Sequence, residues 1–192
     1  NTRIKGISNE EISNHWIAAN IQQGHGALGA AYPDVSWGVE GDTPSFLSLI
    51  PNGLNSPEHP DWGGWGGRYQ LIVPDFAILK KGNSGVPLEP ETRAIWTDAE
   101  DNYTPFYPNE FGRAIKQDTL HFKDNKATLW RWRTDFQHDF AARMDWCLAD
   151  YKKANHPPVP VINQPDVITV KSGQSFGIDA SSTYDPDGDS FS

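Results

Sequence analysis

The chain has few of the features that assign a sequence quickly to a class. It contains one cysteine among 192 residues, so no internal disulfide can form and cysteine use indicates no redox compartment. It has no apolar run of about 18 residues, which leaves no membrane span. No run of lysine or arginine exceeds two residues, and the net charge is −9 at pH 7. Binding to a phosphate backbone needs a basic surface, so we expect neither nucleic acid nor a membrane as partner.

Several enzyme motifs are missing as well. The six histidines show no paired metal-binding spacing, and the sequence has neither a glycine-rich phosphate loop nor a Gly-x-Ser-x-Gly turn. These absences disfavour cofactor-dependent enzymes and serine hydrolases. The single cysteine, Cys147, falls within a helical apolar pattern. We therefore predict that Cys147 is a buried core residue and not a nucleophile.

The chain is rich in tryptophan and in loop-forming residues. It has eight tryptophans, 17 glycines and 15 prolines, with 37% apolar and 21% charged residues, which is typical of a globular protein with long loops. Tryptophan rings suit sugar faces and interfaces, but they also fill cores. The count by itself favours core packing.

Two helices and a change of period organise the sequence. The spacing of Ser8 and Glu11 predicts a capped helix that ends at 24–26, and the helix 134–153 has the clearest apolar face. A short helix is expected over 46–50, a strand within 69–79, and irregular structure over 80–108. Beyond two consecutive prolines the apolar residues alternate with polar ones, which is typical of a β-sandwich.

The first candidate site is the segment 40–45. Asp42 stands just before a Thr-Pro pair that can open a helix, so its carboxylate would lie where open α/β sheets bind ligands. Carboxylate oxygens suit calcium, and Glu40 could serve as a second ligand or as an acid or base. The alternative is that Asp42 only caps the helix, since aspartate is among the preferred N-cap residues.

The second candidate site is the loop from His59 to Tyr69. Trp62 and Trp65 are separated by glycines, which let the backbone approach a ligand, while Asp61 and Arg68 could hydrogen-bond sugar hydroxyls. The alternative, that the two rings fold back and cover the domain, stays equally open. His25, between two glycines, is a further candidate for lining the ligand crevice.

A third candidate is the acidic run from Asp185 to Asp189. Alternating carboxylates with a glycine resemble a calcium loop, although the terminal glutamate of a complete hand is missing. Within ASSTYDPDGDS the run is similar to a turn of PKD-type, immunoglobulin-like modules, where it is chiefly structural.

Longer stretches resemble a known family. VEGDTPSFLSLIPNGLNSPEHPDWGGWGGRY, the helix WRWRTDFQHDFAARMDW and the linker ANHPPVPV are similar to bacterial cellulose-binding proteins with a nucleoside hydrolase-like domain and an immunoglobulin-like C-terminal domain. The resemblance implies an α/β fold. Residues 1–154 would be the C-terminal part of the nucleoside hydrolase-like domain, a Rossmann-type open sheet. Residues 155–158 would be a linker, and 159–192 the first strands of the immunoglobulin-like sandwich.

The resemblance also implies a function. In nucleoside hydrolases a calcium ion orients the attacking water, and a late aspartate at a helix start completes its ligands; Asp42 matches that position. The family's Asp-rich N-terminal cluster is missing here, and Gly41 stands where those enzymes have histidine. We expect the chain to be part of a longer polypeptide that is secreted or periplasmic.

Two functions follow from this resemblance. One is a hydrolase of glycosyl bonds in which Asp42 holds calcium and Glu40 assists the water or the leaving group. The other is a non-catalytic protein that binds cellulose or another polysaccharide on the same scaffold, which Gly41 and the tryptophan-rich loop favour.

Overall fold

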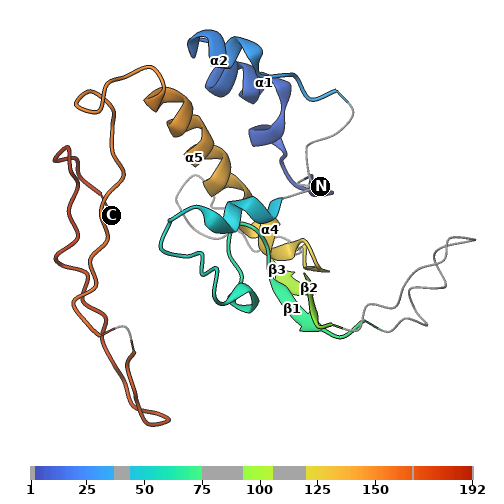
Figure 1. The fold of residues 1–192 in the computed structure, drawn as a ribbon, viewed down its shortest axis with the longest axis vertical. Helices are drawn as coiled ribbons and strands as arrows, with labels where there is room; N and C mark the ends of the chain where they lie inside the picture. The colour runs from blue at the N-terminus through green and yellow to red at the C-terminus, as the bar shows by residue number, and fades with distance from the viewer. Residues whose placement is uncertain (1–2, 37–43, 75–92, 106–119, 166, 192) are drawn as a thin grey trace, which may run out of the picture. The chain divides into compact units, whose positions relative to one another are not determined.

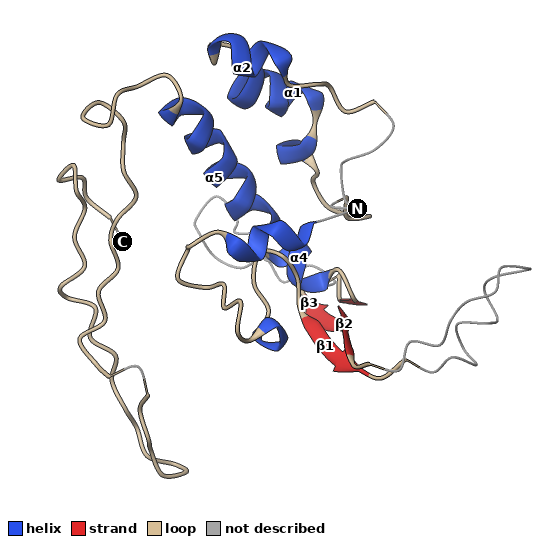
Figure 2. Cartoon of the chain, viewed as in Figure 1, coloured by secondary structure: helices blue, strands red, loops and turns tan. Residues whose placement is uncertain are grey.

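The computed structural model describes residues 3–36, 44–74, 93–105, 120–165 and 167–191 (Figure 1). The chain forms two compact units, Asn1–Met144 and Asp145–Ser192. Helices and short strands belong to the first unit, whereas the second consists almost entirely of loop (Figure 2). Within the described ranges no helix has the length and apolar character needed to cross a membrane.

The N-terminal segment forms a series of short helices. A 3-10 turn, η1 (Glu10–Ile12), precedes α1 (Asn14–Ile17), a π-helical turn η2 (Ala18–Gln22) and α2 (Gly26–Ala31). The predicted helix start is displaced: the Ser8 hydroxyl accepts the Glu10 N–H at 3.3 Å before η1, but α1 opens at Ser13, whose hydroxyl accepts the Trp16 N–H at 3.1 Å. The predicted end is confirmed, because Gly24 adopts a φ of 82° just after η2. A glycine takes that conformation at little cost.

The long helix α5 (Arg133–Trp146) is shorter than its sequence pattern predicts. Cys147 and Leu148 lie in the turn that follows, and both are exposed, so the prediction of a core cysteine is wrong. The chain reverses here, and the indole N–H of Trp146 donates to the carbonyl oxygen of Asn155 at 2.7 Å. This hydrogen bond connects the end of α5 to the loop that follows it. The apolar pattern in the sequence continues past residue 146, but the helix does not.

Helix α5 contributes to two small hydrophobic clusters. Toward its C-terminal end Met144 is buried against Ile17 and Ile21 of the N-terminal helices. Toward its N-terminal end Phe136 is buried against Trp65 and against Leu129 of α4 (Ala127–Arg131). Burying side chains of this size stabilises a fold by roughly 1.5–3 kcal/mol each. One helix therefore joins the N-terminal helices to the tryptophan-rich loop.

A buried arginine attaches the N-terminal segment to α5. The Arg133 guanidinium, in a residue that is 4% exposed, donates to the Asn9 side-chain oxygen at 2.7 Å and to the Ser8 carbonyl at 2.6 Å. It also lies 3.4 Å from the Glu11 carboxylate. One turn further along α5, the Gln137 amide donates to the Glu11 carbonyl at 2.7 Å. These polar contacts add to the burial of Ile4 and Ile12 in the same segment.

Two antiparallel strand pairs complete the first unit. Strand β1 (Tyr69–Ile72) pairs with β2 (Ile95–Asp98), and β3 (Asp101–Tyr103) pairs with β4 (Phe122–Asp124). The predicted strand within 69–79 is confirmed over its first four residues, but β2 and β3 lie in the segment predicted to be irregular. The described ranges contain these two small sheets and no parallel one. The Rossmann-type sheet implied by the resemblance is therefore not seen in them.

The second unit is held by hydrogen bonds between its two ends. Val159 and Tyr184 form an antiparallel bridge, and the Asn163 N–H donates to the Asp179 carbonyl at 2.9 Å. The alternating apolar residues of this unit are largely exposed, among them Phe176. The immunoglobulin-like sandwich, and with it the division into 1–154, 155–158 and 159–192, stays a prediction.

The acidic run of the second unit forms a turn bound to the proline linker. The Asp185 carboxylate accepts the N–H groups of Asp187 and Asp189 at 2.8 and 3.1 Å. The Asp187 carboxylate accepts the His156 N–H at 2.6 Å and lies 3.0 Å from its ring Nδ1. Hydrogen bonds from the backbone and side chain of His156 lower the pKa of Asp187. Two carboxylates of the run thus have structural partners, and calcium binding here stays a prediction.

Candidate functional site

The two predicted catalytic residues, Glu40 and Asp42, lie outside the described residues. Across the ranges that are described, no three or more histidine, cysteine, aspartate or glutamate side chains gather as a group that could hold a metal ion. The described side chains therefore do not supply a calcium shell. Calcium binding by Asp42 stays a prediction.

His25 is placed by helix packing. It is the residue before α2, it is buried, and its carbonyl accepts the Gly29 N–H at 3.0 Å. A Cβ on Gly29 would stand 2.7 Å from the His25 Cβ and 2.5 Å from the Gln22 carbonyl oxygen, so only glycine fits this junction. His25 is not among the residues that line the pocket described below.

The tryptophan-rich loop is built around one asparagine. The Asn55 amide donates to the carbonyls of Leu47 and Ile50 at 2.7 and 2.8 Å, and its oxygen accepts the Trp65 N–H at 3.0 Å. Asn55 thereby joins the turn after η3 (Pro44–Leu49) to the loop. A Cβ on Gly64 would lie 2.4 Å from the Asn55 oxygen, so this glycine is required for the close approach.

The two tryptophans predicted to bind sugar have different environments. Trp65 is buried with Leu129 and Phe136, and its ring meets Phe136 edge-on with centroids 6.5 Å apart. The packing alternative thus describes Trp65. Trp62, at the end of η4 (Pro60–Trp62), is 62% exposed, and its ring stacks on His59 at 4.1 Å with an interplanar angle of 6°. The stack fixes the indole while leaving most of its surface open to solvent.

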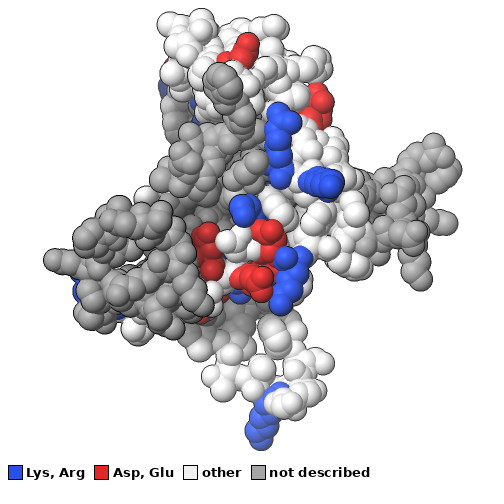
Figure 3. Space-filling view, turned by 90° about the vertical axis from the view of Figure 1, so that its right-hand side faces the viewer, with Lys and Arg blue, Asp and Glu red and all other residues white. Residues whose placement is uncertain are grey.

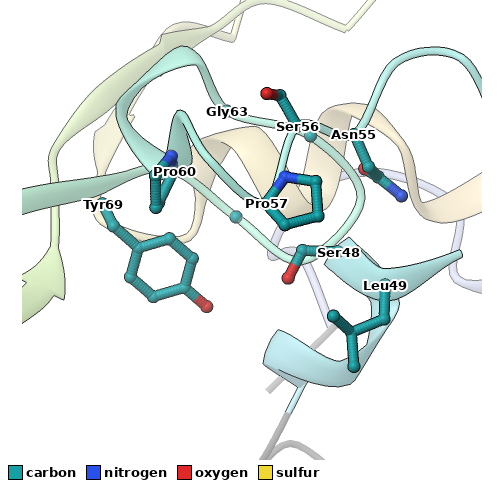
Figure 4. A pocket seen from close by; sticks show the side chains of 10 residues that line it. Ser48, Leu49, Asn55, Ser56, Pro57, Pro60, Gly63 and Tyr69 are labelled. Atoms are coloured by element: carbon teal, nitrogen blue, oxygen red, sulfur yellow. The ribbon is translucent and has the colours of Figure 1, made fainter.

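A pocket of about 150 Å³ lies within the same loop (Figure 4). Tyr69 and Pro60 stand on one side of it, and Leu49 stands on the other. Its lining combines apolar rings with small polar groups: Ser48, Leu49, Asn55, Ser56, Pro57, Pro60, Gly63, Gly64, Gly67 and Tyr69. Pockets that enclose drug-sized ligands measure about 300–1,000 Å³, so this one has room for a small ring or a chain end.

A network of ion pairs around Asp101 holds Arg68 at the end of the tryptophan-rich loop. The Arg68 guanidinium donates to the Asp61 carbonyl at 3.0 Å and lies 3.4 Å from the Asp101 carboxylate. Asp101 also accepts hydrogen bonds from the Thr128 hydroxyl at 2.7 Å and from Arg131 at 3.0 Å. Arg68 was predicted to bind sugar, but its side chain connects η4 to Asp101 and so has a structural role. The side chain of Asp61, in an exposed residue, remains available to a ligand.

Asp101 is strongly acidic in this setting. Burial raises the pKa of its carboxyl, but hydrogen bonds from Thr128, the Asn102 N–H and Arg131, with the Arg131 charge, lower it to about 2. A carboxyl with a folded-state pKa below its ordinary 3.8 stabilises the fold above that value, and the contribution is lost as pH falls through about 2. The network is therefore intact at neutral pH.

Asp101→Asn should lower the free energy of unfolding by about 1–2 kcal/mol at pH 7, because it removes the charge that Arg68 and Arg131 face. The loss should shrink below pH 4 and vanish only below pH 2, because the native carboxyl is about half protonated at pH 2 and fully protonated at lower pH. Urea unfolding of the full chain at several pH values measures it. Glu100→Gln, which removes an exposed partner of Lys123, is the control and should change little. An Asp101→Asn loss of equal size at every pH would contradict this account.

Charged side chains of both signs share one face of the chain (Figure 3). The described ion pairs include Lys123 with Glu100 at 3.3 Å and Lys126 with Asp124 at 3.6 Å. Among the described residues that this view shows, acidic and basic side chains lie close together, so these residues form no continuous basic surface for a polyanion there.

The first third of the chain matches a nucleoside hydrolase-like domain. Residues 1–69 match the family described as cellulose-binding Sde182, nucleoside hydrolase-like domain. The matched segment contains the Asn55-anchored loop, Trp62 and the start of β1. No curated protein and no solved structure matches the chain.

Sequence reasoning found the loop but missed its supports. Asp101, Thr128 and Arg131 come from segments far from the loop in sequence, and no local pattern connects them to Arg68. Asn55 was also missed, although an asparagine in a segment rich in glycine and proline often hydrogen-bonds neighbouring backbone. The pocket residues Ser48 and Ser56 are likewise brought together by the fold.

Proposed function

We propose that this chain binds a neutral polysaccharide of the cellulose type through the loop 51–69. The observation that carries the proposal is the exposed Trp62 ring, stacked on His59 beside a pocket, within the segment that matches a cellulose-binding family. An indole held flat presents an apolar face of the kind on which a sugar ring can stack.

The pocket and the charge of the chain favour the same class of ligand. A sugar ring presents both apolar C–H faces and hydroxyls, and the pocket offers the Tyr69 ring beside the polar groups of Ser48 and Ser56. The net charge of −9 works against an anionic polysaccharide. A neutral glycan fits both features. An insoluble polysaccharide lies outside the cell, so this proposal agrees with the expectation of a secreted or periplasmic protein.

Trp62→Ala should weaken binding to cellulose at least about tenfold, because it removes the platform without touching the core. Binding isotherms of the full chain on insoluble cellulose measure this change. Trp62→Phe should keep part of the affinity, since it retains a ring.

Tyr151→Ala serves as the matched control, because it removes an exposed ring in the second unit. It should bind like wild type. If Trp62→Ala and Tyr151→Ala bind cellulose equally well, or if the wild-type chain does not bind, the proposed function is wrong.

Hydrolysis of a glycosyl bond stays a prediction that rests on Glu40, Asp42 and the resemblance to nucleoside hydrolases. No described side chain adds support to it. Binding is therefore the function that we put forward.

A further inference from the structure

One face of the β1–β2 hairpin continues from the pocket. In the register of this pair Tyr69 lies opposite Asp98, and Leu71 lies opposite Trp96. Residues directly opposite each other in an antiparallel pair share a face, as do residues two apart on one strand. These four side chains therefore share one face, and its Tyr69 end lines the pocket.

The part of this face formed by Leu71 and Trp96 is apolar and open to solvent. Trp96 is 48% exposed and Leu71 is 55% exposed, although both are large apolar side chains in paired strands. Two residues along a strand cover about 7 Å, and diagonal neighbours across a pair lie about 7–8 Å apart. Tyr69 and Trp96 are diagonal neighbours of this kind, so the hairpin places a second aromatic ring one short step beyond the pocket.

Polar groups on the same face indicate what could cover it. The carboxylate of Asp98, an exposed residue, stands between the pocket end of the hairpin and the loop after β4, where the Asn125 amide approaches it at 3.5 Å. A carboxylate accepts strong hydrogen bonds from hydroxyl donors. The rings of Tyr69 and Trp96 can pack against the C–H faces of sugars, and the Asp98 carboxylate can accept hydrogen bonds from their hydroxyls. A glycan presents both kinds of group along its length. An apolar protein surface would instead remove this charged carboxylate from water and offer it no hydrogen-bond donor, which is costly.

We propose that the hairpin face carrying Tyr69, Leu71 and Trp96 binds the sugar rings that follow the one at the loop. The ligand is then an extended, unbranched chain of neutral sugars, and its affinity depends on chain length. This inference rests on the proposed function and deepens it, because Trp62 and the pocket by themselves require only one sugar ring.

The test measures affinity against chain length. Isothermal titration of the full chain with β-linked glucose oligosaccharides of increasing length should give, for wild type, a dissociation constant that falls with each added sugar until the face is covered. Trp96→Ala should keep the wild-type affinity for the shortest oligosaccharide that binds. It should lose most of the gain from length, about fivefold to tenfold for the longest. Trp96→Tyr should recover part of that gain.

Ile95→Ala is the matched control, because Ile95 is the neighbouring residue on the opposite face of the same hairpin and is 39% exposed. It should leave the length dependence unchanged. Wild-type behaviour of Trp96→Ala at every length would overturn the inference, as would equal losses in both variants. Wild-type binding that does not vary with length would overturn it while leaving the proposed function standing. No binding by wild type to any oligosaccharide or to cellulose would overturn both.

Discussion

Arg133→Ala should lower the free energy of unfolding by about 2–3 kcal/mol, because hydrogen bonds made by a charged group contribute roughly 1.5–3 kcal/mol. The variant removes the guanidinium that donates to Asn9 and Ser8 and that faces the Glu11 carboxylate. Ser8, Asn9 and Glu11 are only partly shielded from solvent, whereas the guanidinium is buried, so the variant removes these hydrogen bonds and leaves a gap where the side chain packed. Urea unfolding of the full chain, followed by tryptophan fluorescence, measures the change.

The control for this prediction lies on the same helix. Arg143 pairs with Asp139 at 2.6 Å in an i,i+4 arrangement, but its side chain is 44% exposed. Arg143→Ala should therefore cost less than about 1 kcal/mol. Arg133→Lys should fall between the two, because an ammonium keeps the charge but cannot reproduce the forked donors. Equal losses for Arg133→Ala and Arg143→Ala would show that the buried contacts contribute little.

Gly64→Ala should destabilise the tryptophan-rich loop by about 2–4 kcal/mol. The added methyl group would stand 2.4 Å from the Asn55 oxygen, so Asn55 would have to move. Three hydrogen bonds depend on that side chain, and each contributes roughly 0.5–1.5 kcal/mol. Because the loop presents Trp62, the same variant should also weaken binding to cellulose. Urea unfolding and cellulose isotherms measure the two effects.

Two further variants isolate the cause of that effect. Gly177→Ala adds a methyl group where no atom lies within 4 Å, and it should change the free energy of unfolding by less than about 0.5 kcal/mol. If the clash acts through Asn55, the losses of Gly64→Ala and Asn55→Ala should be strongly non-additive in the double variant. Full additivity would place the cause elsewhere.

The fold was predictable where the signal is local. The helix from about residue 134, the end of the N-terminal helix at Gly24 and the strand beginning at Tyr69 all follow from period, glycine and alternation, and the structure confirms them. The start of α1 was missed because Ser8 and Ser13 both offer a hydroxyl at a suitable spacing. Ser13 has the extended backbone of a cap, and its hydroxyl accepts the Trp16 N–H that opens α1.

Strands β2 and β3 were missed for a different reason. Their sequences carry little apolar alternation, since Asp98, Asp101 and Asn102 are among their seven residues. They are strands because β1 and β4 supply hydrogen-bonding partners from elsewhere in the chain. Pairing of this kind depends on tertiary context more than on intrinsic propensity.

The candidate site shows the same division. The sequence identified the loop and both of its tryptophans, and it left open whether each ring binds or packs. Trp65 packs, because it is buried against Leu129 of α4 and Phe136 of α5. Trp62 is exposed, so its ring can contact a ligand. Arg68 could not be assigned from sequence because its partner, Asp101, lies 33 positions further along the chain.

By itself the sequence determined the net negative charge, the long helix near residue 134 and the aromatic loop with its glycines, because these depend on residue type and near-neighbour spacing. Only the tertiary structure decided which aromatic rings face solvent, which charges support the loop, and that Tyr69 and Trp96 share a face. Those relations depend on which distant segments meet, and that choice is made by packing and pairing across the whole unit.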